Sequence, residues 1–358
     1  MPPTRATARR RTPPRLAAAL TATALLAAAG CGGEEEPPPR AAPGPVTVAV
    51  AGDVHFAGAS AAAAEPGGLD AIAGVLGDAD VTVVNLETAI TDRGTPAAKQ
   101  YVFRAPARAL GALRAAGVDV AGLANNHALD YGRQGLTDTL AAGREQGLPL
   151  IGAGEDAAAA FQPFTTTVRG HRLAVLDATQ VLDTSLAGAW TATDDQPGLA
   201  AVRDDAGRER LLGAVRAARA GADSVVVLLH WGKELEECPS PAQRDLAGAL
   251  VAAGADAVVG SHAHRLLGGG WLAAGGRRGY VDYGLGNFVF YAKKGVTTAT
   301  GVLRLTLPGG GGVGEARWSP ARIRGGVPVP LEGADAEEAL AAKDALRPCT
   351  DLEGAARP

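Results

Sequence analysis

The sequence is poor in aromatic side chains, which make up 4% of its 358 residues. So small a share provides no rich stacking surface for single-stranded nucleic acid. Blocks of basic residues are also absent beyond the extreme N-terminus, and the formal net charge is −4. Proteins that bind nucleic acids usually carry a basic patch or stripe. We therefore expect no nucleic-acid partner.

Cysteine is scarce as well, with only Cys31, Cys238 and Cys349 in the chain. Their spacing does not match a cysteine-based metal site. Outside the cytoplasm, Cys238 and Cys349 can oxidise to one disulfide that ties the C-terminal end to the loop at Cys238. The alternative is two unrelated thiols.

The sequence begins with an export signal. Residues 1–30 contain five arginines and no acid, and a short apolar run over residues 16–30 ends in small residues directly before Cys31. This run is shorter than the roughly 20 residues of a membrane-spanning helix, and the whole pattern is typical of a signal peptide. Small residues before a cysteine resemble a bacterial lipobox, which predicts that Cys31 is acylated and anchors the protein to the outer face of the cell membrane. The alternative is a plain secretory signal with an incidental cysteine.

The remaining chain divides by composition. Residues 31–45 are rich in glutamate and proline, which predicts a partly stiff tether. Hydrophobic residues make up 47% and charged residues 20% of the chain, so a sizeable core is possible. We predict one domain over residues 46–308, with a C-terminal hairpin and helix over residues 309–358 packed on it.

From residue 46 onward, short runs rich in valine and leucine alternate with stretches rich in alanine and leucine. Near-continuous apolar runs are typical of strands covered on both faces, and a glycine after a helical stretch is a common stop signal. The expected strands are 46–51, 81–84, 118–123, 173–176, 224–229, 257–259 and 280–283, and the expected helices are 107–116, 135–146, 208–220 and 242–253. This alternation predicts an α/β layered fold, in which sites gather beyond the carboxyl ends of the strands.

Five of the six histidines directly follow predicted strands, each near a carboxylate or an amide. Imidazole and carboxylate together suit Zn, Fe or Mn. The potential ligands are Asp53, His55, Glu87, Asn126, His230, His262 and His264. They suffice for two divalent ions that share a bridging group, the arrangement that recurs in phosphoester hydrolysis. Each motif alone also fits a structural role, but the five together indicate a site.

The order of these motifs resembles the calcineurin-like metallophosphoesterase superfamily and, more closely, the CapA family of poly-γ-glutamate capsule synthesis proteins. The motifs that carry the resemblance are Gly52-Asp53, Asn85-Leu86-Glu87, Asn125-Asn126-His127 with Asp130-Tyr131-Gly132, His230-Trp231-Gly232 with Glu234, Gly260-Ser261-His262-Ala263-His264, and Leu285-Gly286-Asn287-Phe288. The resemblance implies a four-layer α/β/β/α sandwich, in which two β-sheets lie between layers of helices.

The resemblance also implies a role for each residue of the site. One ion would be bound by Asp53, His55 and His264, and the other by Asn126, His230 and His262. Glu87 would bridge the two ions, and His127, oriented by Asp130, would act as the general acid. Two features depart from the pattern, because the superfamily normally bridges with aspartate rather than Glu87 and CapA-type chains often lack the histidine at position 55.

Three functions remain open at this point. The first is a surface-tethered, metal-dependent hydrolase of phosphoesters or related substrates, linked to capsule or envelope polymer synthesis and its proteins. The second is a non-catalytic accessory of an anionic-polymer machine, and the third is a solute-binding lipoprotein with a structural metal cluster. The pair of His127 and Asp130 favours the first, because binding alone needs no general acid.

Overall fold

The computed structural model describes residues 43–354. The predicted signal peptide, the lipid anchor at Cys31 and most of the predicted tether lie outside the described residues. Among residues 43–354, no helix has both the length and the apolar character needed to cross a bilayer.

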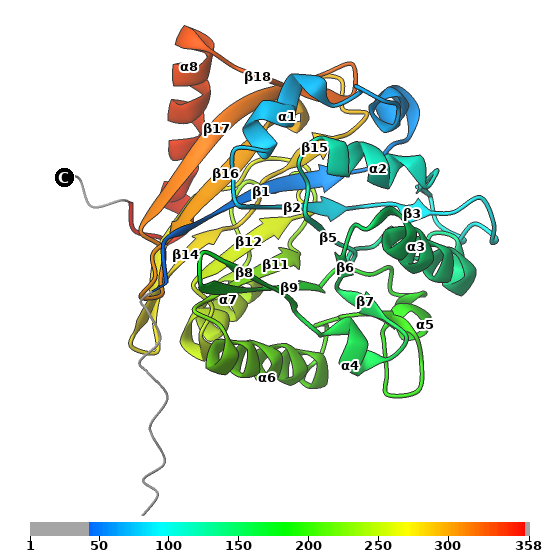
Figure 1. The fold of residues 1–358 in the computed structure, drawn as a ribbon, viewed down its shortest axis with the longest axis horizontal. Helices are drawn as coiled ribbons and strands as arrows, with labels where there is room; N and C mark the ends of the chain where they lie inside the picture. Colours follow the sequence, from blue (N-terminus) through cyan, green and yellow to red (C-terminus); the bar gives the residue numbers. More distant parts are fainter. Residues whose placement is uncertain (1–42, 355–358) are drawn as a thin grey trace, which may run out of the picture. The chain divides into compact units, whose positions relative to one another are not determined.

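Two mixed β-sheets form the centre of the fold (Figure 1). The strands of the first sheet are β1 (Val46–Val54), β2 (Val81–Leu86), β5 (Val120–Gly122), β6 (Leu150–Ile151), β15 (Asn287–Val289), β16 (Ala299–Leu307), β17 (Glu315–Arg324) and β18 (Val327–Pro330). Those of the second are β8 (Phe164–Val168), β9 (His171–Thr179), β11 (Ser224–His230), β12 (Ala257–Ser261), β13 (Gly269–Ala274) and β14 (Arg277–Asp282). The strand order is β18-β17-β16-β1-β2-β5-β6 in the first sheet, where β15 also pairs with β1, and β13-β14-β12-β11-β9-β8 in the second.

Helices and short strand pairs complete the described fold. The helices are α1 (Asp70–Leu76), α2 (Arg108–Ala115), α3 (Gly132–Gln146), α4 (Ala157–Ala160), α5 (Ala187–Trp190), α6 (Asp205–Gly221), α7 (Pro241–Ala253) and α8 (Gly333–Asp344). The short pairs are β3 (Ala89–Ile90) with β4 (Arg104–Ala105), and β7 (Ala153–Gly154) with β10 (Gly198–Leu199).

Alternation along the central strands builds three hydrophobic layers. In β1, Val48 and Val50 pack against the second sheet, whereas Ala49 and Ala51 lie in the core that contains α1, α2 and α3. Successive side chains of a strand point to opposite faces, so one run of apolar residues supplies both layers. In the same way, β11 contributes to the layer between the sheets and to the core formed with α6 and α7. The four-layer α/β/β/α sandwich is thereby confirmed.

The end of β1 passes very close to the loop that precedes β15. A Cβ atom placed on Gly52 would lie 1.9 Å from the carbonyl oxygen of Gly286, so this position requires glycine. The amide of the next residue, Asp53, donates a hydrogen bond to the same carbonyl over 3.0 Å. The register of β1 also shifts between Asp53 and Val54. Irregularities of this kind change the direction in which following side chains point.

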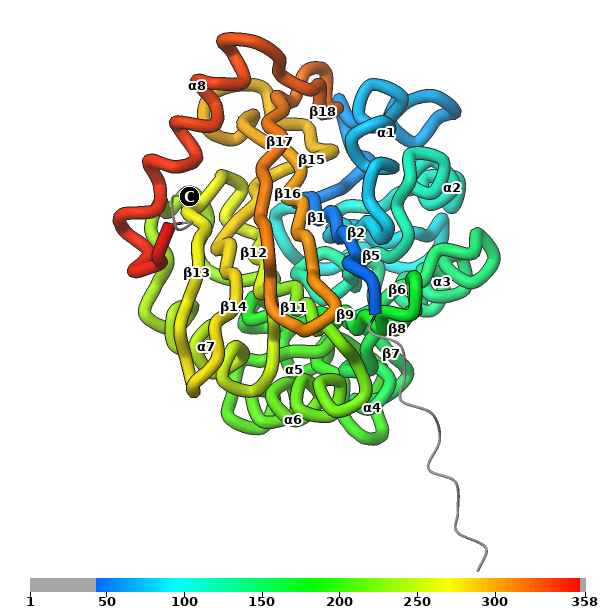
Figure 2. The backbone as a smooth tube through the Cα atoms, turned by 60° about the vertical axis from the view of Figure 1, so that its left-hand side comes forward, coloured from blue at the N-terminus to red at the C-terminus, as the bar shows by residue number. Residues whose placement is uncertain are grey.

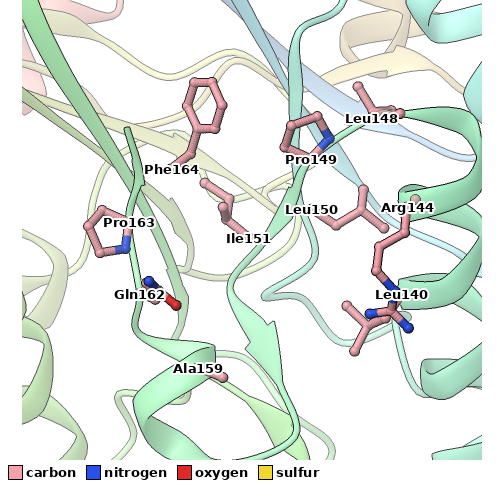
Figure 3. Close-up of a pocket in the computed structure, with 12 residues that line it drawn as sticks. Leu140, Arg144, Leu148, Pro149, Leu150, Ile151, Ala159, Gln162, Pro163 and Phe164 are labelled. Carbon is pink, nitrogen blue, oxygen red and sulfur yellow. The ribbon is translucent and has the colours of Figure 1, made fainter. Parts of the chain in front are cut away.

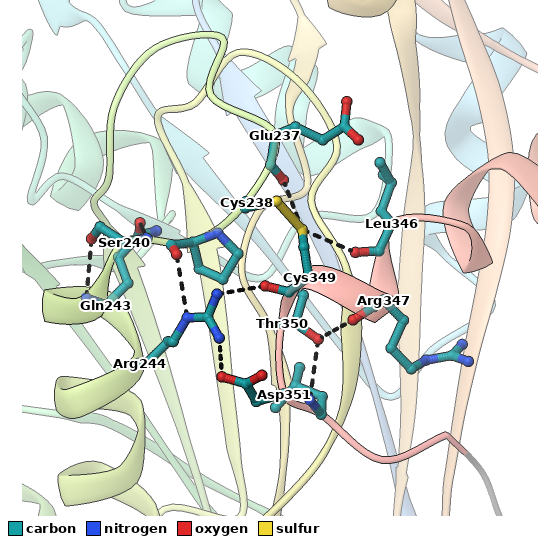
Figure 4. Close-up of a disulfide and its surroundings, with 12 residues drawn as sticks. Glu237, Cys238, Ser240, Gln243, Arg244, Leu346, Arg347, Cys349, Thr350 and Asp351 are labelled. Carbon is teal, nitrogen blue, oxygen red and sulfur yellow. Dashed lines mark hydrogen bonds and ion pairs between the residues drawn. A yellow bond between two sulfur atoms is a disulfide. The ribbon is translucent and has the colours of Figure 1, made fainter.

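The C-terminal part of the chain continues the first sheet. Strands β16 and β17 form an antiparallel hairpin beside β1, with α8 following β18 (Figure 2). Cys238, in the loop after β11, forms a disulfide with Cys349, and their Cα atoms lie 5.6 Å apart (Figure 4). Arg244 of α7 reinforces this junction, because it donates to the carbonyl of Cys349 over 2.6 Å and forms an ion pair with Asp351. The C-terminal segment is therefore tied to the loop that follows His230.

Removing this disulfide is expected to destabilise the protein. It links residues 111 positions apart, and a crosslink over so long a loop strongly restricts the unfolded chain. We expect the double variant Cys238→Ser/Cys349→Ser to lower the free energy of unfolding by about 2–4 kcal/mol, measured by urea denaturation. Reductant should weaken the wild type and leave the double variant unchanged. Equal stability of the two proteins would contradict the prediction.

A surface cavity of about 460 Å³ opens between α3, β6 and the start of β8 (Figure 3). Its lining is mostly apolar, and Arg144 is the charged residue among the side chains that line it. None of the potential metal ligands contributes to it. The chemistry expected from the sequence therefore lies elsewhere.

Candidate metal centre

The potential ligands lie where neighbouring strands of both sheets end. Strands β1, β2 and β5 run parallel in one sheet, and β9, β11 and β12 run parallel in the other. The carboxyl ends of parallel strands meet at the same edge of a sheet, so side chains distant in sequence come together there. The residues that these strand ends supply are Asp53, Glu87, Asn126, His230, His262 and His264.

Five of these residues form two groups of potential ligands. The ligand atoms of Glu87, His230 and His262 all lie within 4.8 Å of one another, and so do those of Asp53, Glu87 and His264. Glu87 belongs to both groups. Its two carboxylate oxygens are buried and accept no hydrogen bond within residues 43–354, although Oε1 lies 3.4 Å from His230 Nε2. A buried carboxylate without hydrogen bonds is costly, and divalent cations would satisfy it.

His230 is fixed at the centre of the first group. Its Nδ1 lies 2.9 Å from the hydroxyl of Ser261, while its Nε2 lies 2.8 Å from Asn126 Oδ1 and 3.1 Å from His262 Nδ1. The amide oxygen of Asn126 therefore lies beside this group. Burial lowers the pKa of His230 and that of His262, so both rings are neutral and can offer a lone pair to a cation.

The second group is built around Asp53. Its Oδ2 lies 3.4 Å from His264 Nδ1, and its Oδ1 accepts a hydrogen bond from Asn85 over 2.7 Å. Asn287, a residue of the sequence motif without an assigned role, places its Oδ1 2.9 Å from His264 Nδ1 and so orients that ring. Burial acts to lower the pKa of His264, but Glu87 and Asp53 outweigh it and raise the pKa to about 9. Burial raises the pKa of Glu87, and the nearby carboxylate of Asp53 raises it further.

The turn that carries both C-terminal histidines has an unusual backbone. His262 and His264 have φ angles of 86° and 53°, in the left-handed region that non-glycine residues rarely adopt. The amide of His262 donates to Asp53 Oδ2 over 3.2 Å. Such strained conformations concentrate at functional sites, where the surrounding structure enforces them.

His127 and Asp130 form a buried pair beside these groups. The distance between His127 Nδ1 and Asp130 Oδ2 is 2.6 Å, and Asp130 Oδ2 also accepts the amide of Phe103 over 2.6 Å. Asn125 shapes the turn, because its Oδ1 accepts the amide of His127 over 3.0 Å. Burial lowers the pKa of His127, and the bond to Asp130 opposes that shift. The imidazole is thus fixed through Nδ1, which leaves Nε2 for other interactions.

The structure places His55 outside both ligand groups. Its Nδ1 accepts a hydrogen bond from the amide of Ala57 over 3.0 Å, so the proton of the neutral ring is on Nε2. Burial lowers the pKa of His55 to about 3, which keeps the ring neutral. It packs among Phe103, Phe290 and Tyr291 at centroid distances of 4.5, 4.0 and 4.6 Å. Its Nε2 is buried and has no hydrogen-bond partner among the described residues.

Two polar residues of the site have no role assigned to them from the sequence. Asn85 connects the groups, because its amide nitrogen contacts Asp53 Oδ1 over 2.7 Å and His230 Nδ1 over 3.2 Å. In the sequence, Asn85 stands out only as part of the Asn85-Leu86-Glu87 motif. Lys99 lies next to Asp130 and Asn126, yet it stands in an irregular segment without periodicity or a recognisable motif.

Comparisons with known proteins agree with this geometry. The two stacked sheets and the His/Asp/Glu cluster at their strand ends define an α/β/β/α protein with a candidate metal centre. More specifically, residues 47–292 match the family model described as "Bacterial capsule synthesis protein PGA_cap", and the chain belongs to this family. The resemblance to the CapA family is thereby confirmed.

Individual relatives show how far the similarity extends. The chain is 41% identical over 179 residues to "Capsule biosynthesis protein CapA" of Bacillus anthracis, a match that covers 50% of this chain and 42% of that protein. It is 33% identical over 232 residues to "PGA biosynthesis protein CapA" of Bacillus subtilis (strain 168), which covers 63% of this chain and 56% of that protein. The chain thus spans about half the length of the curated relatives it matches.

Solved structures include one of similar fold. The crystal structure of a 5'-nucleotidase precursor from Thermus thermophilus matches with a TM-score of 0.50 and 16% identity, over 84% of this chain and 58% of that chain. At this identity the match shows the shared fold alone.

Proposed function

We propose that this protein is a metal-dependent hydrolase of phosphoesters or related substrates that acts in the synthesis or export of poly-γ-glutamate or another envelope polymer. The observation that carries the proposal is the buried pair of His127 and Asp130 beside two ligand groups that share Glu87. The membership in a capsule synthesis family and the names of the Bacillus relatives support the polymer context. In this proposal the chain is exported and tethered to the membrane through a lipid on Cys31.

The two ligand groups would hold two divalent ions, with Mn, Fe and Zn as the metals that suit the donors. Asp53, Glu87 and His264 would bind one ion, and Glu87, His230, His262 and Asn126 the other. When bound, such a pair neutralises charge on the phosphoryl group and supplies an activated water.

The chain's own residues would handle the proton. His127 is held through Nδ1 by Asp130, so its Nε2 is available to donate a proton to the leaving oxygen. Phe103 packs against the ring of His127 at a centroid distance of 4.3 Å and limits its movement. A ring fixed in one orientation is what a general acid requires.

The test is hydrolysis of bis(p-nitrophenyl) phosphate by the protein purified without chelator and supplied with Mn²⁺. We expect turnover that is lost with EDTA and restored by Mn²⁺. Protein that contains two metal ions per chain but hydrolyses neither this substrate nor a panel of phosphomonoesters and phosphodiesters would overturn the hydrolase proposal.

That result would favour a non-catalytic accessory of an anionic-polymer machine. One observation supports this second candidate, since a Mycobacterium tuberculosis relative, 35% identical over 189 residues, is named "Probable polyglutamine synthesis accessory protein Rv0574c". Binding of poly-γ-glutamate that requires metal, without any turnover, would identify it.

The geometry of His55 gives a separate prediction about the ligand set. We expect His55→Phe, which keeps an aromatic ring among Phe103, Phe290 and Tyr291, to retain the wild-type number of metal ions per chain in elemental analysis. Asp53→Asn is the matched control and should lose metal. A loss of about one ion per chain from His55→Phe would show that His55 is a ligand after all.

A further inference from the structure

Lys99 is a buried cation of the site. It lies in the irregular segment between β3 and β4, yet only 7% of its side chain is exposed. A buried ammonium group is costly unless its three N–H donors find acceptors. Its Nζ lies 2.9 Å from Asp130 Oδ1 and 3.4 Å from Asp183 Oδ2, and it donates to the backbone carbonyl of Asn126. Its polar partners thus come from two segments, the loop between β5 and α3 and the loop after β9.

The contact of Lys99 with Asp130 affects His127, the proposed general acid. Asp130 is fully buried, and it pairs with both the ammonium group of Lys99 and the ring of His127. Lys99 pairs with Oδ1 of Asp130, while Oδ2 lies 2.6 Å from His127 Nδ1 and also accepts the amide of Phe103. The ammonium group therefore holds the carboxyl group in the position that orients the ring of His127.

The contact of Lys99 with Asn126 affects a potential metal ligand. Lys99 holds the backbone carbonyl of Asn126, whose side-chain oxygen lies 2.8 Å from His230 Nε2. One ammonium group thus restrains both a potential ligand and the residue that orients His127. Lys99 also forms an ion pair with Asp183, and its Nζ lies 5.2 Å from the centre of the Trp190 ring. These contacts fix Lys99 from α5 and the loop that precedes it.

We propose that Lys99 is the positioning residue of this centre: it holds Asp130 against His127 Nδ1 and holds Asn126 beside His230. Its effect on turnover rests on the proposed hydrolase function, whereas its effect on His127 does not. Lys99 acts through Asp130 and Asn126 and needs no contact with the substrate.

The experiment compares Lys99→Met and Lys99→Arg with Lys233→Met, a matched control whose lysine is 77% exposed on the loop after β11. In metal-free protein labelled with ¹⁵N-histidine, the wild type and the control should show a strongly deshielded Nδ1–H resonance for His127, assigned by its loss in His127→Gln. We expect Lys99→Met to lose or shift this resonance and Lys99→Arg to retain it. With Mn²⁺ present, Lys99→Met should lower kcat about 10- to 100-fold, a part of what general acid catalysis contributes, with KM within about twofold.

Several outcomes separate the alternatives. A folded Lys99→Met protein that keeps the His127 resonance overturns the proposal, even if it is less stable, because Lys99 would then only support the fold. If Lys99→Met does not fold, Asp183→Asn removes one partner of Lys99 and should shift the same resonance, and an unmoved resonance there overturns the proposal. If the wild type shows no turnover, the hydrolase proposal fails, and the resonance alone decides the role of Lys99.

Discussion

Glu87→Gln is expected to abolish tight metal binding while making the metal-free protein more stable. Glu87 belongs to both ligand groups, so its loss affects both ions, and we expect metal affinity to fall by more than about 100-fold. Without metal, its buried carboxylate accepts no hydrogen bond within the described residues. The neutral amide has nearly the same shape, so the free energy of unfolding in EDTA should rise by about 1–2 kcal/mol.

Two measurements check this pair of opposite effects. Elemental analysis gives the metal content, and urea denaturation with EDTA or with Mn²⁺ gives the stability of each form. Wild type should gain stability from Mn²⁺, because an ion that binds only the folded state stabilises it, whereas Glu87→Gln should gain little. Glu234→Gln is the control, since Glu234 is exposed, lies in the loop after His230 and belongs to neither group. A Glu87→Gln protein that binds metal like the wild type, or that is destabilised in EDTA, contradicts the prediction.

The layered fold could be predicted from the sequence because its signals are local. Runs such as residues 224–229 are apolar at almost every position, which is typical of strands covered on both faces. The strand at β11 (Ser224–His230) and the helix at α7 (Pro241–Ala253) lie where these patterns place them. The gathering of Glu87 and His230 follows from the same logic, because parallel strands end at one edge of their sheets.

Features that depend on contacts distant in sequence could not be predicted. The spacing of Asp53 and His55 predicts two ligands for one ion, and that prediction stays open, but nothing in the sequence indicates that the His55 ring packs among Phe103, Phe290 and Tyr291. Strand β15 (Asn287–Val289) has three residues, too few for a periodic pattern. Lys99 acquires its partners only through the folded arrangement of three loops, so its sequence neighbours contain no hint of its position.

His127→Gln is expected to separate catalysis from metal binding. His127 lies in neither ligand group, so the variant should keep the wild-type metal content. Glutamine fills similar space but cannot deliver a proton to a leaving oxygen near neutral pH. We therefore expect kcat for a phosphodiester with a basic alkoxide leaving group to fall by about 10²- to 10⁴-fold, with KM changed far less, and kcat for bis(p-nitrophenyl) phosphate to fall by a smaller factor. Steady-state kinetics on protein of measured metal content checks both statements.

A second buried histidine provides the control for this loss. His171 lies at the start of β9, where its ring contacts the Gly44 carbonyl over 3.1 Å and the Ser224 hydroxyl over 3.0 Å, away from both ligand groups. His171→Gln should therefore change stability without a comparable fall in kcat. A substrate with a good leaving group needs less help from an acid, so the deficit of His127→Gln should grow as the leaving group becomes more basic. An equal deficit for all leaving groups would contradict a proton-donating role for His127, because a general acid acts on the departing oxygen.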